Sequence, residues 1–93
     1  MVLYKMAQLQ IEIQENTKEA KVTISSEKSL LNPEITDMIF EVYQIAEKYR
    51  GEPAKRNKDF PVRNGKTTVA QISLKFPNLG CLTQFRDDIL SLS

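Results

Sequence analysis

The sequence predicts a small α+β domain in two layers, with an antiparallel sheet of three to four strands and two helices on one face, in the order ββαββα. Two segments within the first 25 residues alternate apolar and polar side chains, as half-buried strands do. Two later segments repeat apolar side chains every three or four residues, as amphipathic helices do. An Asn-Gly pair between them indicates a second hairpin.

The first hairpin is predicted by two alternating runs joined by a short polar connection, Asn16-Thr17-Lys18. A period of two places the apolar side chains of each run on one face. These side chains are Ala7, Leu9, Ile11, Ile13, Ala20, Val22 and Ile24. The opposite face is rich in glutamine and has no aromatic side chain, whereas an RNA-recognition sheet would place aromatic residues there for base stacking.

The first helix is predicted to begin at Asn32-Pro33, because asparagine caps helices and proline tolerates the first helical position. Apolar residues then recur at three- and four-residue spacing and line one face. They are Ile35, Met38, Ile39, Val42, Ile45, Ala46 and Tyr49. We expect Gly51 to take the left-handed conformation that ends the helix.

Residues 51–59 show no apolar period and are predicted to form a loop. A short strand over residues 60–63 precedes the Asn64-Gly65 turn, and Pro61 confines that strand to a sheet edge. The apolar residues of the next strand and of the second helix are Ala70, Ile72, Leu74 and Phe76, then Leu79, Leu82, Phe85, Ile89 and Leu92.

A single domain over residues 1–93 is the expected organisation, because a chain of 93 residues provides one core and little more. No run approaches the roughly 18 apolar residues of a membrane span, and the first residues do not resemble a secretory signal. Met6-Ala7 is also a natural start, in which case residues 1–5 are an extension. The single cysteine, Cys81, favours a soluble chain in the reducing cytoplasm.

The residue types of common catalytic and metal sites are missing. The chain has no His and one Cys, which removes the usual general base, a Cys–His or Ser–His pair and zinc ligation within the chain. Asp87 and Asp88 are adjacent on a helix, so their side chains diverge. We therefore expect no enzyme, no cofactor and no metal, and a minimal enzyme without a recognisable motif is the third hypothesis.

Positive charge is concentrated in residues 48–66, which carry a net charge of +5, whereas residues 1–47 carry −4. The cations are Lys48, Arg50, Lys55, Arg56, Lys58, Arg63 and Lys66. They could contact phosphates, and the interleaved Tyr49 and Phe60 could stack on bases. Nucleic-acid binding is therefore the second functional hypothesis, and a solvated loop is the alternative interpretation of the same residues.

The first helix carries two aromatic residues away from its apolar stripe. At about 100° per residue, Phe40 lies about 165° and Tyr43 about 105° from the centre of that stripe, on the side that Glu47 shares. Either the basic loop or residues 2–4 cover these aromatic rings, or a partner does. The leading hypothesis is a non-enzymatic protein-interaction or regulatory module with a candidate interface of Phe40, Tyr43 and Glu47. Its partner would be another protein or a second copy in a homodimer.

Overall fold

The chain folds into the two-layer α+β arrangement that the sequence predicts. A computed structural model describes residues 7–27, 33–55 and 57–92. The first five residues, the Asn32 cap and Arg56 lie outside this part. Strands β1 (Ala7–Gln14) and β2 (Glu19–Ser26) form the first hairpin, and helix α1 (Pro33–Lys48) follows. Strands β3 (Glu52–Pro53), β4 (Lys58–Asn64) and β5 (Thr67–Lys75) precede helix α2 (Leu79–Leu92).

All strand pairs are antiparallel, and the sheet order is β1-β2-β5-β3, with β4 also paired to β5. β3 and β4 share one edge of β5, because Glu52 lies opposite Lys75 and Val62 opposite Val69. The sheet therefore has five strands rather than three to four. The sequence does not predict β3, because this strand is only two residues long, contains Pro53 and is too short to show an alternation of apolar and polar residues.

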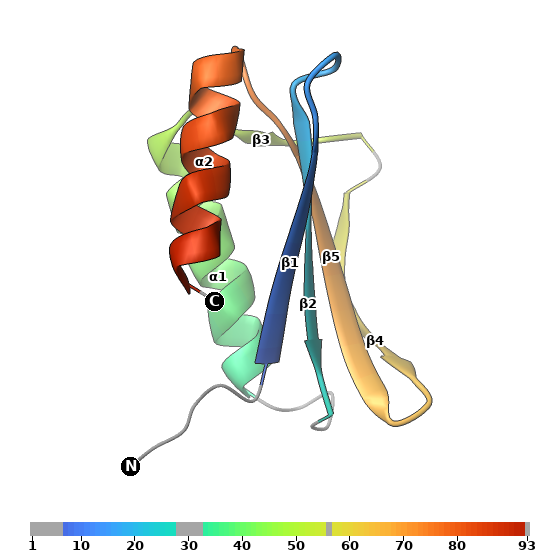
Figure 1. The fold of residues 1–93 in the computed structure, drawn as a ribbon. Coiled ribbons are helices and arrows are strands. Elements are labelled where there is room, and N and C mark those ends of the chain that lie inside the picture. The colour runs from blue at the N-terminus through green and yellow to red at the C-terminus, as the bar shows by residue number, and fades with distance from the viewer. Residues whose placement is uncertain (1–6, 28–32, 56, 93) are drawn as a thin grey trace.

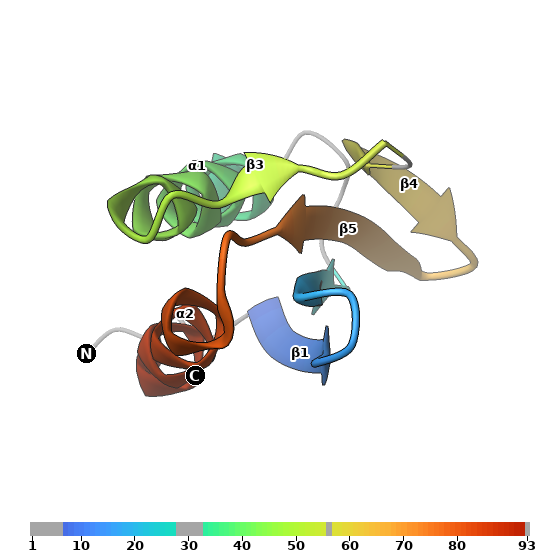
Figure 2. The ribbon, with the colours of Figure 1, turned by 90° about the horizontal axis from the view of Figure 1, so that it is seen from above.

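The core fills the space between the sheet and the helices. Figures 1 and 2 show both helices on one face of the sheet, with α2 beside β1 and α1 further along towards β5 and β3. The inner sheet face is closed to solvent, since Val22, Ile24 and Ile72 are 0% exposed. The helices contribute the buried side chains Ile35, Val42, Ala46, Leu82, Phe85 and Ile89. The apolar periods of the sequence thus identify the buried face of each element, except that Leu79, predicted on that face of the second helix, is 44% exposed at the start of α2.

The β4–β5 hairpin turns one residue later than the sequence predicts. Asn64 pairs with Thr67, so Gly65 and Lys66 form the two-residue loop. Gly65 has φ +66°, whereas Asn64 stays within β4. Glycine at the first of two loop positions is what a type II′ turn requires.

The exit from α1 also differs from the expectation. The left-handed residue is Arg50, with φ +62°, and not Gly51. The Arg50 N–H donates to the Glu47 carbonyl at 3.1 Å and the Gly51 N–H to the Ala46 carbonyl at 2.8 Å, which are the two bonds of a Schellman cap. Glycine is needed at position 51 for space, because a Cβ there would lie 2.5 Å from Cε2 of Phe76.

Adjacent substitutions at this exit should have opposite effects on stability. We expect Gly51→Ala to lower the free energy of unfolding by about 1–3 kcal/mol, because the added methyl group overpacks against the Phe76 ring. We expect Arg50→Gly to raise it by up to about 1 kcal/mol, because glycine adopts positive φ without strain. Urea denaturation of both variants measures the two changes. A destabilised Arg50→Gly beside a neutral Gly51→Ala would instead support the assignment of Gly51 as the left-handed residue.

Candidate functional site

Phe40 is the most exposed large hydrophobic side chain of the described residues, at 63%. It lies in the middle of α1, and Thr36, Gln44 and Glu47 on the same side of the helix are also exposed. The opposite side carries Val42, which is 0% exposed. Phe40 therefore points away from the core, as its position relative to the apolar stripe implies.

Tyr43 is engaged within the fold. Its hydroxyl donates to Oδ2 of Asp59 at 2.5 Å and accepts a hydrogen bond from Nδ2 of Asn57 at 2.6 Å. Oδ1 of Asn57 in turn accepts from the Ser73 N–H at 2.8 Å. These residues, which we call the Tyr43 network, connect α1, the segment before β4, β4 itself and β5. The two aromatic residues of the candidate interface thus differ. Tyr43 is bonded to residues that follow β3, whereas Phe40 is open to solvent.

The Tyr43 network also affects the acidity of the phenol. Partial burial, and then the hydrogen bond to Asp59, raise the pKa of Tyr43 above its ordinary value of 10.0, although the bond from Asn57 acts in the opposite direction. Both main causes favour the neutral phenol, which can donate to a carboxylate. The network therefore depends on a protonated Tyr43.

The six described cations of residues 48–66 are spread along the molecule and do not form one cluster. Nζ of Lys48 lies 3.3 Å from Oδ2 of Asp88 on α2, and Nη1 of Arg63 donates to Oγ1 of Thr68 at 3.1 Å. Figure 1 shows β3 and the β4–β5 turn at opposite ends of the sheet. Four further cations are exposed along this length, namely Arg50, Lys55, Lys58 and Lys66.

The two aromatic residues of the basic segment differ in their environments. The Tyr49 hydroxyl donates to Oδ2 of Asp88 at 2.8 Å, and this bond lowers the pKa of the Asp88 carboxyl. Phe60 is 59% exposed. Exposure alternates over the first five residues of β4, so Lys58, Phe60 and Val62 are exposed, and the pairing of β4 with β5 shifts register between Lys58 and Val62. Only Phe60 of these two aromatic residues presents most of its surface to solvent.

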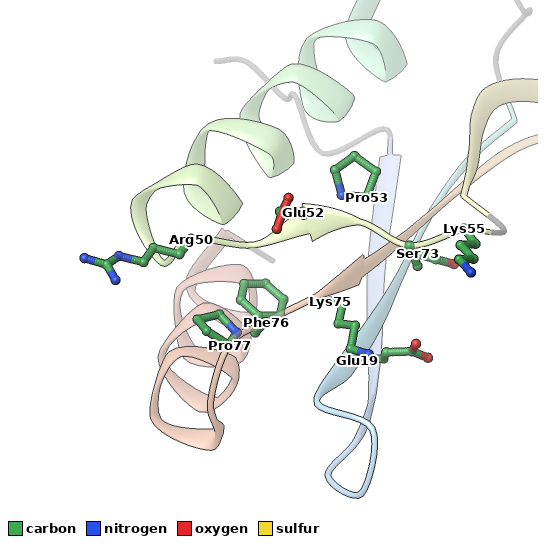
Figure 3. Close-up of a pocket in the computed structure, with 10 residues that line it drawn as sticks. Glu19, Arg50, Glu52, Pro53, Lys55, Ser73, Lys75, Phe76 and Pro77 are labelled. Carbon is green, nitrogen blue, oxygen red and sulfur yellow. The ribbon is translucent and has the colours of Figure 1, made fainter.

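A wide hollow lies where β3 meets the end of β5 (Figure 3). Its walls carry charges of both signs, with Glu19 and Glu52 beside Lys55 and Lys75. Arg50 belongs to the same wall, but Figure 3 shows its side chain extending away from the other residues. The hollow thus offers neither a uniform charge nor a closed apolar surface.

Residues 7–27, 33–55 and 57–92 contain no group of three or more His, Cys, Asp or Glu side chains that could hold a metal ion. No helix in the same ranges has the length and hydrophobicity to cross a membrane. Comparison of the chain with protein-family models, curated proteins and solved structures gives no match. Its function must therefore be inferred from its own surfaces.

Sequence reasoning missed several residues that shape these surfaces. The sequence predicts a loop without an apolar period at Asn57 and Asp59, although both residues bind Tyr43. The apolar period of the second helix also does not predict the exposure of Leu79 and Leu90, at 44% and 52%. A helical wheel of α2 could have indicated the two leucines, whereas the Tyr43 network brings together residues 14 and 16 positions apart and leaves no local signal.

Tyr43→Phe tests the Tyr43 network. We expect it to lower the free energy of unfolding at neutral pH by about 1–2 kcal/mol, because Asp59 and Asn57 each lose a partner. We also expect a change at alkaline pH. Because folding raises the pKa of Tyr43, its contribution is complete below pH 10 and is lost as pH rises through the folded-state pKa.

Urea denaturation between neutral and strongly alkaline pH measures both effects. The wild type should lose more stability across the alkaline range than Tyr43→Phe does. Tyr49→Phe is the matched control, because it removes a phenol bonded to Asp88 and leaves the Tyr43 network intact. Parallel pH curves for the wild type and Tyr43→Phe would contradict the assigned role of this phenol.

Proposed function

We propose that this protein is a non-enzymatic module that binds another protein molecule through the outer side of α1. The observation that carries the proposal is the 63% exposure of Phe40. A large aromatic side chain in water is a hydrophobic area available for burial, and aromatic residues dominate the energetics of protein interfaces. We infer that Phe40 inserts into an apolar pocket of the partner.

The surroundings of Phe40 suggest the chemistry of that partner. Asp37, Glu41 and Glu47 are exposed along α1, and residues 1–47 have a net charge of −4. Carboxylates at the rim of an interface steer a basic partner and repel an acidic one. We therefore propose a partner surface with an apolar pocket surrounded by Lys or Arg, on another protein or on a second copy of this chain.

The Tyr43 network supports a binding role for α1, because it holds the helix against β4 and β5 through side-chain hydrogen bonds. A helix that is already ordered loses little conformational entropy when it binds. We infer a regulatory role in the cytoplasm, where the single thiol of Cys81 would stay reduced.

Photo-crosslinking from position 40 tests this proposal. A photoreactive phenylalanine derivative at position 40 should give an adduct of one defined mass in cells, because the ring enters the partner. Adding Glu47→Lys should reduce that adduct severalfold, because the rim charge is reversed. The same derivative at Gln71, which is exposed on the outer sheet face, is the matched control. The absence of any adduct at position 40, or equal adducts at both positions, would contradict the proposal.

A second candidate function, nucleic-acid binding, is favoured by one specific observation. Lys58, Phe60 and Val62 are exposed at alternate positions of β4, and Phe60 is 59% exposed. An aromatic ring beside a lysine is the arrangement that single-strand binding surfaces use for base stacking and phosphate contact. We propose single-stranded nucleic acid as the ligand of this surface, with Lys55 and Lys66 extending it along the strand edge.

A filter-binding titration at two salt concentrations tests this candidate. Phe60→Ala should weaken binding of a single-stranded oligonucleotide by about 1–3 kcal/mol because a stacking contact is lost. Replacing Lys55 and Lys58 by Gln should reduce the dependence of affinity on salt, by a slope of about 0.7 for each phosphate contact removed. Lys21→Gln on β2 is the matched control. Affinity that does not depend on salt, or that the substitutions at Lys55, Lys58 and Phe60 leave unchanged, would rule out this function.

A further inference from the structure

The outer edge of β1 is a long strand edge with few of the features that protect such edges. β1 stands at the end of the sheet order, and its eight residues pair only with β2 among the strands of the described residues. Its pairing with β2 runs from Ala7 opposite Ser26 to Gln14 opposite Glu19 without a register shift. Natural edge strands usually carry proline, a bulge or lysine, and β1 has only Glu12 as a charged residue.

An apolar strip on α2 lies beside this edge. Leu79 and Leu90 are 44% and 52% exposed. At about 100° per residue, both lie about 180–200° around the helix from Asp88. Asp88 binds Tyr49 and therefore marks the side of α2 that faces α1. The two leucines thus face away from α1, and Figure 2 shows that this is also the direction in which the outer edge of β1 points.

The apolar face of β1 is less well covered than the faces of its neighbours. Leu9, Ile11 and Ile13 are only partly buried, although they pack against the core. Their partners on β2 are nearly closed to solvent, with Val22 and Ile24 at 0%. Apolar surface therefore continues from the core, across β1 and onto the leucine strip of α2.

The apolar and polar pattern of β1 is self-complementary, so β1 could pair with a second copy of itself. Residues 8–14 read Gln-Leu-Gln-Ile-Glu-Ile-Gln, so apolar and polar positions are mirrored about Ile11. We propose that two copies of this chain associate by antiparallel pairing of β1 with β1 about a two-fold axis at Ile11. A two-fold interface requires such a self-complementary patch, because each residue meets the mirror position in the other copy.

Charge selects this register. Pairing about Ile11 places Leu9 opposite Ile13, and Gln10 opposite Glu12. A register shifted by two residues towards the carboxyl end would place Glu12 opposite Glu12 of the second copy, and like charges directly opposite each other are unfavourable. A shift by a single residue would put apolar side chains on the polar face. In the symmetric register the apolar face is therefore continuous, and each Glu12 carboxylate lies opposite the neutral amide of Gln10 in the other copy.

The position of α2 fits the same axis. Strands in a sheet are about 4.8 Å apart, so a two-fold axis outside β1 lies about 2.4 Å from β1 and about 7 Å from β2. Packed helices are about 8–10 Å apart, so each α2 should lie about 4–5 Å from the axis, above the space between β1 and β2. α2 does contact both strands, and β1 more extensively. The leucine strips of the two copies would then meet, and Phe40 would stay outside the interface.

Sedimentation analysis of the full chain across a concentration series up to about 1 mM tests the proposal. The wild type should form a dimer. Gln10→Glu should raise its Kd by about two- to thirty-fold, because two like-charge pairs appear across the axis, and Gln10→Lys should lower the Kd by a similar factor. Leu79→Asp should raise the Kd about tenfold or more, and its fold should persist because a carboxylate suits the first turn of a helix.

Phe40→Asp is the matched control, because it introduces the same charge at a more exposed position on the other helix and should leave the Kd unchanged. Amide hydrogen exchange should also show that protection of β1 rises with protein concentration. A monomer at every concentration would overturn the proposal, as would a dimer that Gln10 and Leu79 substitutions do not affect. A dimer weakened by Phe40→Asp alone would also overturn it and would support self-association through α1 instead.

Discussion

The packing of α1 against one side of the sheet is the constraint on which the other features depend. Ile35 and Val42 are 0% exposed and Ala46 is 1% exposed, and the helix contacts β2 and β5. Burial of an apolar stripe fixes the rotation of a helix about its axis. Once that rotation is set, Phe40 faces solvent and Tyr43 faces the segment that precedes β4, so one aromatic residue is open and the other is bonded.

A second constraint acts at the end of α1 and directs the chain that follows. The Phe76 ring leaves no space for a side chain at position 51. Because Gly51 has no side chain, the backbone passes close to this ring and then pairs with β5 as strand β3. The Tyr43 network then holds Asn57, just before β4, against α1 and β5. Two contacts with residues distant in sequence thus direct the chain from the end of α1 to β4, which carries Lys58 and Arg63.

Much of the fold could be predicted from local patterns, because burial imposes a period of two on Ile11, Ile24 and Ile72 and a helical period on α1 and α2. The remaining features depend on contacts that no local pattern encodes. Position 51 needs glycine although Arg50 is the left-handed residue, because Phe76, 25 residues after Gly51, leaves no room for a Cβ there. The outward position of Phe40 was visible in the helical wheel, whereas the outer edge of β1 became visible only when the order of the strands was known.

Binding through α1 requires position 40 to be exposed, and a single tryptophan measures this exposure directly. The chain has no tryptophan, so Phe40→Trp would supply the only indole signal. At low protein concentration, we expect red-shifted emission that acrylamide quenches nearly as well as it quenches free indole. Blue-shifted emission that resists quenching in the dilute monomer would show that this ring is covered by its own chain, and it would contradict the assignment of α1 as a binding surface.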